Sequence, residues 1–258
     1  MNRLVIIGNG FDMAHGLKTS YMDFINWYWD QRVYGFIGNT TNVSQDCLCK
    51  LVIKETGDFS CWNVFAASNS YFFKDLYQKE RYSGSEVFQE IKQHPETFMV
   101  ECSPFFETIL QSIESKGWVD IENDYYQLLK DSINNPRCEY TITGLNQQLA
   151  FIQSKLVEYL STIKEGEYKS EYQKTITDYF NPDDFSTEGR VRALDNMGLD
   201  FDRPYDKQYF QEEHEKLAPE HIMLLSFNYT KTAQLYGGSN VVHNYIHGGL
   251  TRPETIIF

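Results

Sequence analysis

Positive charge is scarce in this sequence of 258 residues. It carries 23 Lys and Arg against 36 Asp and Glu, which gives a formal net charge of −13. Because affinity for nucleic acids comes mainly from Lys and Arg that neutralise phosphates, this balance argues against general nucleic-acid binding and against a nuclease. A small phosphorylated ligand remains open, since backbone amides and a helix N-terminus can hold a phosphate without net positive charge.

Cysteine is also sparse and lacks the spacing of a metal site. The five cysteines form an odd number in a long chain, which predicts reduced thiols of a cytoplasmic protein. The one close pair, Cys47 and Cys49, is not a C-x-x-C motif, and His15, His243 and His247 share no helical spacing. We therefore predict no zinc or other metal site.

Long apolar runs are missing as well. No stretch approaches the roughly 18 apolar residues that span a bilayer, and Leu4–Ile7 is too short for the apolar region of a signal peptide. We expect a cytoplasmic protein with no membrane partner. Apolar residues make up 41% of the chain and aromatic residues 16%, which is enough for a large core packed largely by aromatic rings.

The predicted sheet is built from both ends of the chain. Leu4–Ile7 is a continuous apolar run ended by Gly8, which is typical of a parallel strand buried on both faces. His221–Phe227 and Val241–Ile246 are predicted as two later strands. The final run Thr255–Phe258 is expected to be a strand, and the sequence leaves open whether that strand is complete at Phe258.

Helical patterns fill the middle of the sequence. Thr19 or Ser20 can cap a predicted helix over 21–31, and residues 34–58 are interpreted as a loop or an embellishment of the fold. Further helices are predicted over 65–80, 103–114, 119–132, 145–163 and 168–179. We expect one α/β domain over 1–258, with a Rossmann-like, mostly parallel sheet and a large helical insertion over about 60–215.

The loop Gly8-Asn9-Gly10-Phe11-Asp12 follows the first predicted strand. A strand, a glycine turn and a helix place backbone amides at the carboxyl edge of a sheet, where nucleotides bind. The dinucleotide fingerprint is not met, because Met13 replaces its third glycine and the acidic residue at the right distance, Asp30, lies in a predicted helix. From spacing alone the loop is either a ligand loop or a tight turn.

The wider sequence around this loop resembles a known family. The stretch from Ile7 to Phe24, IGNGFDMAHGLKTSYMDF, resembles the opening signature of the AbiH family of bacterial abortive phage infection proteins. Trp118–Glu122, Ser226–Thr230 and Ile246–Gly248 resemble further features of that family. The resemblance implies a role in anti-phage defence.

A more distant resemblance links these blocks to sirtuin-like domains of defence proteins. Those domains have a Rossmann-like fold that holds NAD, which several of them destroy during infection, and their critical Asn and His match Asn228 and His247. Two positions depart from that pattern, because Thr230 replaces the usual Asp and Phe11 replaces a small residue. The four-cysteine zinc module of sirtuin deacylases is absent, which disfavours deacylation.

The resemblance suggests residue roles. His247 is a candidate general base, Asn228 could hold a ribose hydroxyl or orient a water, and Asp12 could stabilise positive charge on the ribose. The candidate nucleotide contacts are Gly8, Asn9, Gly10, Phe11, Thr19, Tyr229 and Gly248. The structural alternatives are an Asn that favours a turn, a His that bonds a backbone carbonyl, and an Asp12 that caps the following helix.

Asp120 and Glu122 are two residues apart, so on a helix they point to different faces. We interpret Asp120 as a helix N-cap and Glu122 as an exposed acid in the first turn.

The sequence leaves two functions open: an enzyme that cleaves NAD or a related nucleotide at its glycosidic bond, and a module that senses a nucleotide or a phage component without turnover. No cofactor is required beyond that ligand, and a second copy of the chain or a phage-derived trigger are the partners considered.

Overall fold

The computed structural model describes residues 2–37, 42–54, 82–116, 120–135, 138, 140–180, 186–198 and 218–256. The chain divides into two compact units. The first combines Met1–Leu17 with Lys164–Thr255, and the second comprises Lys18–Ile163 with Ile256–Phe258. The first unit thus combines the start of the sequence with residues 164–255, and the insertion over about 60–215 stays a prediction.

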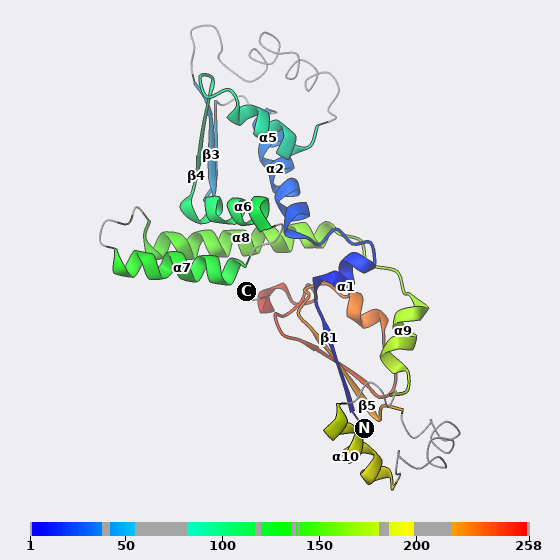
Figure 1. The fold of residues 1–258 in the computed structure, drawn as a ribbon. Coiled ribbons are helices and arrows are strands. Elements are labelled where there is room, and N and C mark those ends of the chain that lie inside the picture. The colour runs from blue at the N-terminus through cyan, green and yellow to red at the C-terminus, as the bar shows by residue number, and fades with distance from the viewer. Residues whose placement is uncertain are drawn as a thin grey trace. The chain divides into compact units, whose positions relative to one another are not determined.

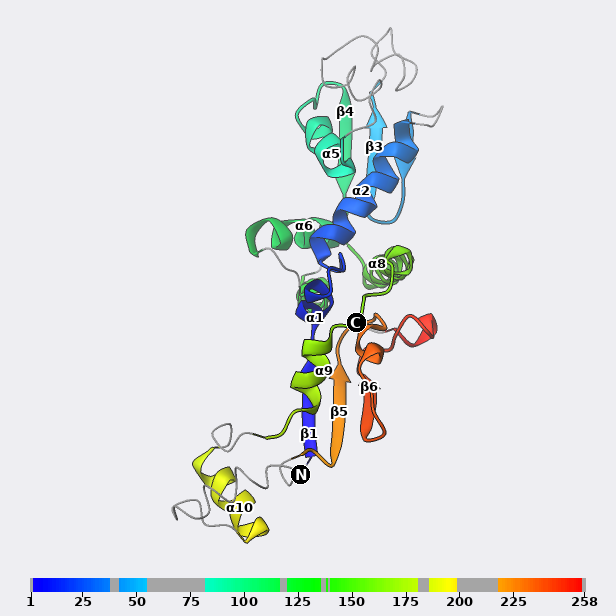
Figure 2. The same ribbon diagram turned by 90° about the vertical axis from the view of Figure 1, so that its right-hand side faces the viewer.

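The first unit is built on a parallel sheet (Figure 2). Its strands β1 (Asn2–Ile7), β5 (His221–Ser226) and β6 (Val241–Tyr245) lie in the order β1-β5-β6, and both pairings are parallel. All three strands coincide with predicted strands, because each is an apolar run followed by a turn. The expectation of an α/β fold with a mostly parallel sheet is confirmed for this unit.

Helical segments cover one face of this sheet. α1 (Asn9–Ala14), α9 (Ser170–Thr177) and the 3-10 helix η3 (Thr232–Leu235) contribute Phe11, Tyr172 and Ala233 to a core that also contains Ile7 and Leu224. The opposite face exposes apolar side chains, namely Leu4, Ile6, Met223 and Val242. The prediction that β1 is buried on both faces is therefore wrong, because the helical segments named above pack on one side only.

The second unit contains an antiparallel sheet that the sequence did not predict. β2 (Val43–Gln45), β3 (Cys49–Ile53) and β4 (Phe98–Cys102) pair in the order β2-β3-β4. The interpretation of residues 34–58 as a loop is thus wrong. In β3, positions 49, 51 and 53 are buried while Lys50 and Val52 are partly exposed, which is the alternation of a strand with one face on a core.

Helices pack against this sheet and against one another (Figure 1). They are α2 (Tyr21–Ile37), α5 (Gly84–Lys92), α6 (Pro104–Lys116), α7 (Ile121–Asn134) and α8 (Ile142–Thr162). α2 and α5 approach closely at Gly84, where an added Cβ would lie 2.1 Å from the Asp30 nitrogen. The absence of a side chain at Gly84 therefore permits the packing that stacks Trp29 on Phe88, with ring centroids 3.5 Å apart.

Most predicted helices are confirmed, including their start signals. Ser20 caps α2, because its hydroxyl accepts from the Asp23 backbone N–H at 3.1 Å. Asp120 caps α7 by accepting from the Asn123 N–H at 3.0 Å, and Glu122 is exposed, as expected. The structure adds α5 and α10 (Thr187–Met197), which the sequence did not predict, while the helix predicted over 65–80 lies outside the described residues.

The end of the sequence departs from the prediction. Thr255 belongs to a short 3-10 helix, η4 (Pro253–Thr255), and Ile256 has no strand pairing, so the predicted strand over 255–258 is wrong at these two positions. Among the helices that the structure describes, none is both long enough and apolar enough to cross a membrane.

Candidate functional site

The carboxyl ends of the three parallel strands meet at one edge of the sheet. Ile7 is paired with Ser226, and Ser226 with Tyr245, so the three chains leave their strands side by side. Hydrogen bonds from Phe227 N to Ile7 O and from Ile246 N to Ser226 O, both 2.9 Å, extend the pairing past the strand ends. The segments that begin at Gly8, Phe227 and Ile246 therefore emerge together, as the sequence predicted for parallel strands.

The glycine loop turns directly into α1. Gly8 is the N-cap residue, and Asp12 lies inside the helix, so the alternative that Asp12 caps the helix is wrong. The helix ends at Ala14, and Gly16, which follows the C-cap residue His15, has a φ of +78°. The N–H groups of Gly16 and Leu17 donate to the Met13 and Asp12 carbonyls. This arrangement is a Schellman motif, which explains the glycine at position 16.

Gly8 and Gly10 have no such structural explanation. Neither has a positive φ, and a Cβ added at either position would meet no atom within 4 Å. Asn9 is exposed between them. Because the fold leaves open space above both glycines, the chain itself does not need glycine there.

The Asp12 carboxylate is buried against the segment that follows β5. Its exposed fraction is 1%, and its Oδ2 accepts a hydrogen bond of 2.7 Å from the Thr230 hydroxyl, which lies 3.1 Å from the Thr232 hydroxyl. The other oxygen, Oδ1, is buried and has no hydrogen-bond partner in the part of the chain that the structure describes. A buried carboxylate oxygen without a donor is costly, so a water or a ligand group is expected to supply one.

Asn228 joins the end of β5 to the glycine loop. Its side-chain Nδ2 donates to the Gly8 carbonyl at 2.9 Å, and its backbone N–H donates to the Ser226 hydroxyl at 3.2 Å. The side chain is buried, with 7% exposed. Asn228 therefore fixes the Gly8 carbonyl, and one amide hydrogen is used in doing so.

His247 and Gly248 follow β6. The His247 ring is partly exposed and lies near Phe227 and Tyr229, with ring centroids 5.6 and 6.1 Å away. Gly248 has a φ of +75°, and a Cβ there would lie 2.2 Å from the Thr255 carbonyl oxygen. The glycine at 248 is therefore required by the fold, unlike Gly8 and Gly10.

A cavity of about 260 Å³ lies at this edge of the sheet. Its lining includes Tyr229 and Thr230 after β5, Tyr245 at the end of β6, and two cationic side chains, Lys231 and Arg252. Thr230 connects this cavity to Asp12 through the hydrogen bond described above. The cavity thus combines aromatic, hydroxyl and cationic groups, which are the groups that bind a phosphorylated ligand with a planar base.

Tyr245 is a site residue that sequence reasoning missed. Its hydroxyl is buried and makes no well-formed hydrogen bond with the described residues. Burial raises the pKa of this phenol, the nearby Gln234 amide partly lowers it, and the negative charge of Asp12 raises it further. The available signal was its position, because Tyr245 directly precedes Ile246-His247-Gly248.

His15 and His243 have structural partners in this unit. The His15 Nδ1 lies 2.6 Å from the Phe11 carbonyl oxygen, and its Nε2 lies 2.5 Å from the Tyr236 hydroxyl. The His243 Nε2 lies 3.0 and 2.8 Å from the Ala233 and Tyr236 carbonyl oxygens, which attaches η3 to β6. No group of three His, Cys, Asp or Glu side chains within the described ranges could hold a metal ion.

Two predicted ligand contacts have other surroundings. The Phe11 ring packs against His15 and Tyr236, with centroids 4.5 and 5.4 Å away, and so belongs to the aromatic cluster under the loop. Thr19 belongs to the second unit, and its predicted contact with the ligand stays a prediction.

Comparison with known proteins supports the resemblance to the AbiH family. A search of curated proteins and a search of solved structures each found no significant match. The family model described as "Bacteriophage abortive infection AbiH" matches residues 4–258, nearly the whole chain and all three segments that form the sheet edge. The chain therefore belongs to the AbiH family, whose description implies a role in abortive infection by bacteriophage.

Proposed function

We propose that the carboxyl edge of the parallel sheet binds an NAD-like nucleotide and that the protein hydrolyses its glycosidic bond during phage infection. The observation that carries this proposal is a buried carboxylate oxygen at this edge, Asp12 Oδ1, which has no hydrogen-bond partner among the described residues. In a folded protein such atoms are nearly always bonded. A ligand with ribose hydroxyls supplies a donor for this oxygen.

The charge around the cavity supports a phosphorylated ligand. Lys231 and Arg252 line the cavity, although the chain as a whole is strongly acidic. The Lys231 ammonium is paired with Glu165 at 3.4 Å, an exposed ion pair that a phosphate could replace at little cost. Gly8 and Gly10 leave open space in which a ligand could approach the backbone.

The proposed reaction is the hydrolysis of NAD to nicotinamide and ADP-ribose. Water attacks the anomeric carbon of the ribose, and the carbon–nitrogen bond breaks with its electron pair leaving on nicotinamide. His247 accepts the proton of the attacking water. Asn228 holds the Gly8 carbonyl and orients the ribose, and Asp12 offers negative charge to the cationic transition state.

A second function, nucleotide sensing without turnover, is favoured by one observation. The Asn228 amide nitrogen and one oxygen of Asp12, Oδ2, are both engaged within the protein, with Gly8 and Thr230 respectively. In this alternative the two residues position the loop, and the nucleotide is bound but not consumed. The two functions share a site and differ in its chemistry.

The deciding experiment follows nicotinamide release from NAD by the purified full chain, with and without phage lysate. We expect His247→Ala and Asn228→Ala to abolish release. Matched controls are His221→Ala and Asn244→Ala. The His221 side chain is exposed at the first residue of β5, at the opposite end of the strand from the carboxyl edge, and the Asn244 side chain is exposed on the open face of the same sheet. Binding without release by the wild type would select the sensor, and neither binding nor release would reject both functions.

A further inference from the structure

Two cysteines lie opposite each other in the antiparallel sheet of the second unit. Cys49 begins β3 and Cys102 ends β4, and the two residues are direct partners in the pairing of these strands. Their sulfur atoms are 3.6 Å apart. This pair is separate from the nucleotide site, which lies in the first unit.

The type of pairing suits a covalent bond between the two sulfurs. The N–H of Ser103 donates to the Leu48 carbonyl at 2.8 Å, which identifies Cys49 and Cys102 as a non-hydrogen-bonded pair. Such pairs have Cα atoms about 4.5 Å apart, near the short end of the range of about 4.4–6.8 Å found in disulfides. Only side-chain rotation and a small approach of the strands are needed to join the sulfurs.

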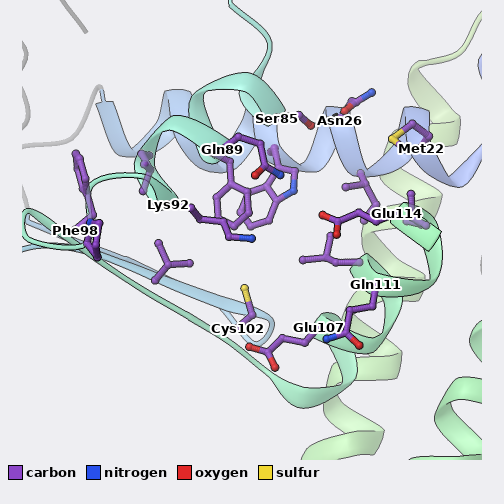
Figure 3. A pocket seen from close by; sticks show the side chains of 18 residues that line it. Met22, Asn26, Ser85, Gln89, Lys92, Phe98, Cys102, Glu107, Gln111 and Glu114 are labelled. Atoms are coloured by element: carbon purple, nitrogen blue, oxygen red, sulfur yellow. Dashed lines mark hydrogen bonds between the residues drawn. The ribbon is translucent and has the colours of Figure 1, made fainter. Parts of the chain in front are cut away.

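The two thiols differ in accessibility. Cys49 is 2% exposed, whereas Cys102 is partly exposed and lines a cavity of about 630 Å³ between α2, α5, β4 and α6. Figure 3 shows the Cys102 sulfur and the Lys92 amine directed into this cavity. Of these two thiols, a small reagent that enters the cavity therefore reaches Cys102 before it reaches the buried Cys49.

The surroundings favour the thiolate of Cys102. The hydrogen bond between the Cys102 and Cys49 sulfurs lowers the pKa of the Cys102 thiol, and the positive charge of Lys92 acts in the same direction. Burial and the carboxylates of Glu107 and Asp46 oppose this effect without reversing it. The thiolate is the form of cysteine that reacts with oxidants.

We propose that Cys102 and Cys49 form an oxidisable thiol pair that reacts with a hydroperoxide entering through the cavity. The Cys102 thiolate attacks one peroxide oxygen, the oxygen–oxygen bond breaks, and the departing oxygen leaves as water or an alcohol after taking a proton. The Cys49 sulfur then attacks the resulting sulfenic acid, forms the disulfide and releases water. The peroxide is reduced by two electrons, and the two thiols supply them.

The remaining described cysteines provide controls. Cys47 is exposed on the chain entering β3, and Cys138 follows α7. Exposure alone would make Cys47 the first thiol to react. The proposal instead predicts that Cys102 reacts first and that its partner is Cys49.

The test treats the reduced, purified chain with a small excess of hydrogen peroxide, followed by alkylation and peptide mass spectrometry. We expect one disulfide between the Cys49 and Cys102 peptides and a loss of two free thiols per chain. Cys47→Ser and Cys138→Ser should leave this product unchanged, and Cys102→Ser should abolish it. In Cys49→Ser, a sulfenic acid on Cys102 should accumulate and be trapped by dimedone.

Three results would overturn the proposal: peroxide that leaves all thiols free, a disulfide that joins other cysteines, or dimedone on Cys47 in place of Cys102. The measurement on the unmodified chain decides the question even if a serine variant folds poorly. Circular dichroism of each variant identifies such a case.

Discussion

Replacing Gly10 by alanine tests whether this glycine is required for folding or for ligand binding. Gly10 lies in α1 with a negative φ, and a Cβ there meets no atom within 4 Å. Alanine is favoured over glycine in a helix by about 0.5–1 kcal/mol. We therefore expect Gly10→Ala to fold with unchanged or higher stability, with a rise in melting temperature of roughly 1–4 °C for a chain of this size.

The same methyl group should harm ligand binding. If a nucleotide approaches the backbone of the glycine loop, the methyl occupies space that the ligand needs, and NAD affinity should fall by about tenfold or more, equivalent to about 1.4 kcal/mol. Differential scanning fluorimetry measures the stability, and isothermal titration calorimetry with NAD measures the affinity. The combination of a stable protein and weakened binding is the expected result.

Gly248→Ala is the matched comparison. Its Cβ would lie 2.2 Å from the Thr255 carbonyl oxygen at a φ of +75°, so this variant should be destabilised whether or not a ligand is present. A Gly10→Ala protein that binds NAD as tightly as the wild type would refute the claim that the ligand contacts this loop. A strongly destabilised Gly10→Ala protein would refute the structural argument itself.

Two further predictions concern buried hydroxyl groups. Thr230→Val removes the hydroxyl that donates to Asp12 and should lower the free energy of unfolding by about 1–3 kcal/mol, whereas Thr230→Ser keeps a hydroxyl and should retain most of the wild-type stability. Equal urea midpoints for the two variants would contradict a stabilising role of this hydrogen bond. Burial, with a smaller contribution from Asp23, raises the pKa of Tyr159 to about 12 from 10.0, and its hydroxyl donates to the Lys18 carbonyl at 2.6 Å. Because the folded state holds this proton more tightly, its contribution is complete below pH 10 and is lost as the pH rises towards 12. Urea unfolding across this range should show a flatter pH dependence for Tyr159→Phe, and identical slopes would count against this assignment.

The parallel sheet and the start signals of several helices follow from local sequence. β1, β5 and β6 are apolar runs closed by turns, and Ser20 and Asp120 have acceptor side chains directly before a helical pattern. Each of these signals is contained in a few consecutive residues. They could be predicted because no distant segment is needed to interpret them.

The antiparallel sheet could not be predicted in this way. β2 has three residues, and β3 interrupts its apolar positions with Lys50, so neither forms a convincing run alone. β4 pairs with β3 across more than forty residues of sequence, and this pairing decides which side chains are buried. Strand propensity is weak without such tertiary contacts.

The candidate site was predictable as a location but not as a set of contacts. Parallel strand ends imply that Asn228 and His247 emerge beside Gly8, which depends only on topology. The bond between Asp12 and Thr230 and the burial of Tyr245 depend on how side chains from distant segments meet. The sequence has no local pattern for such contacts.

The pairing of β1 with β5 has a consequence for biosynthesis. Asn2 and His221 are partners, so β1 waits for its neighbour until more than two hundred further residues have been translated. At about 5–20 residues per second, this delay lasts roughly 10–45 s. The apolar strand β1 must remain without β5 for that time, which exposes it to chaperones and to aggregation. A chain terminated before β5 cannot assemble the proposed nucleotide site, so an activity at that site would require translation past β6.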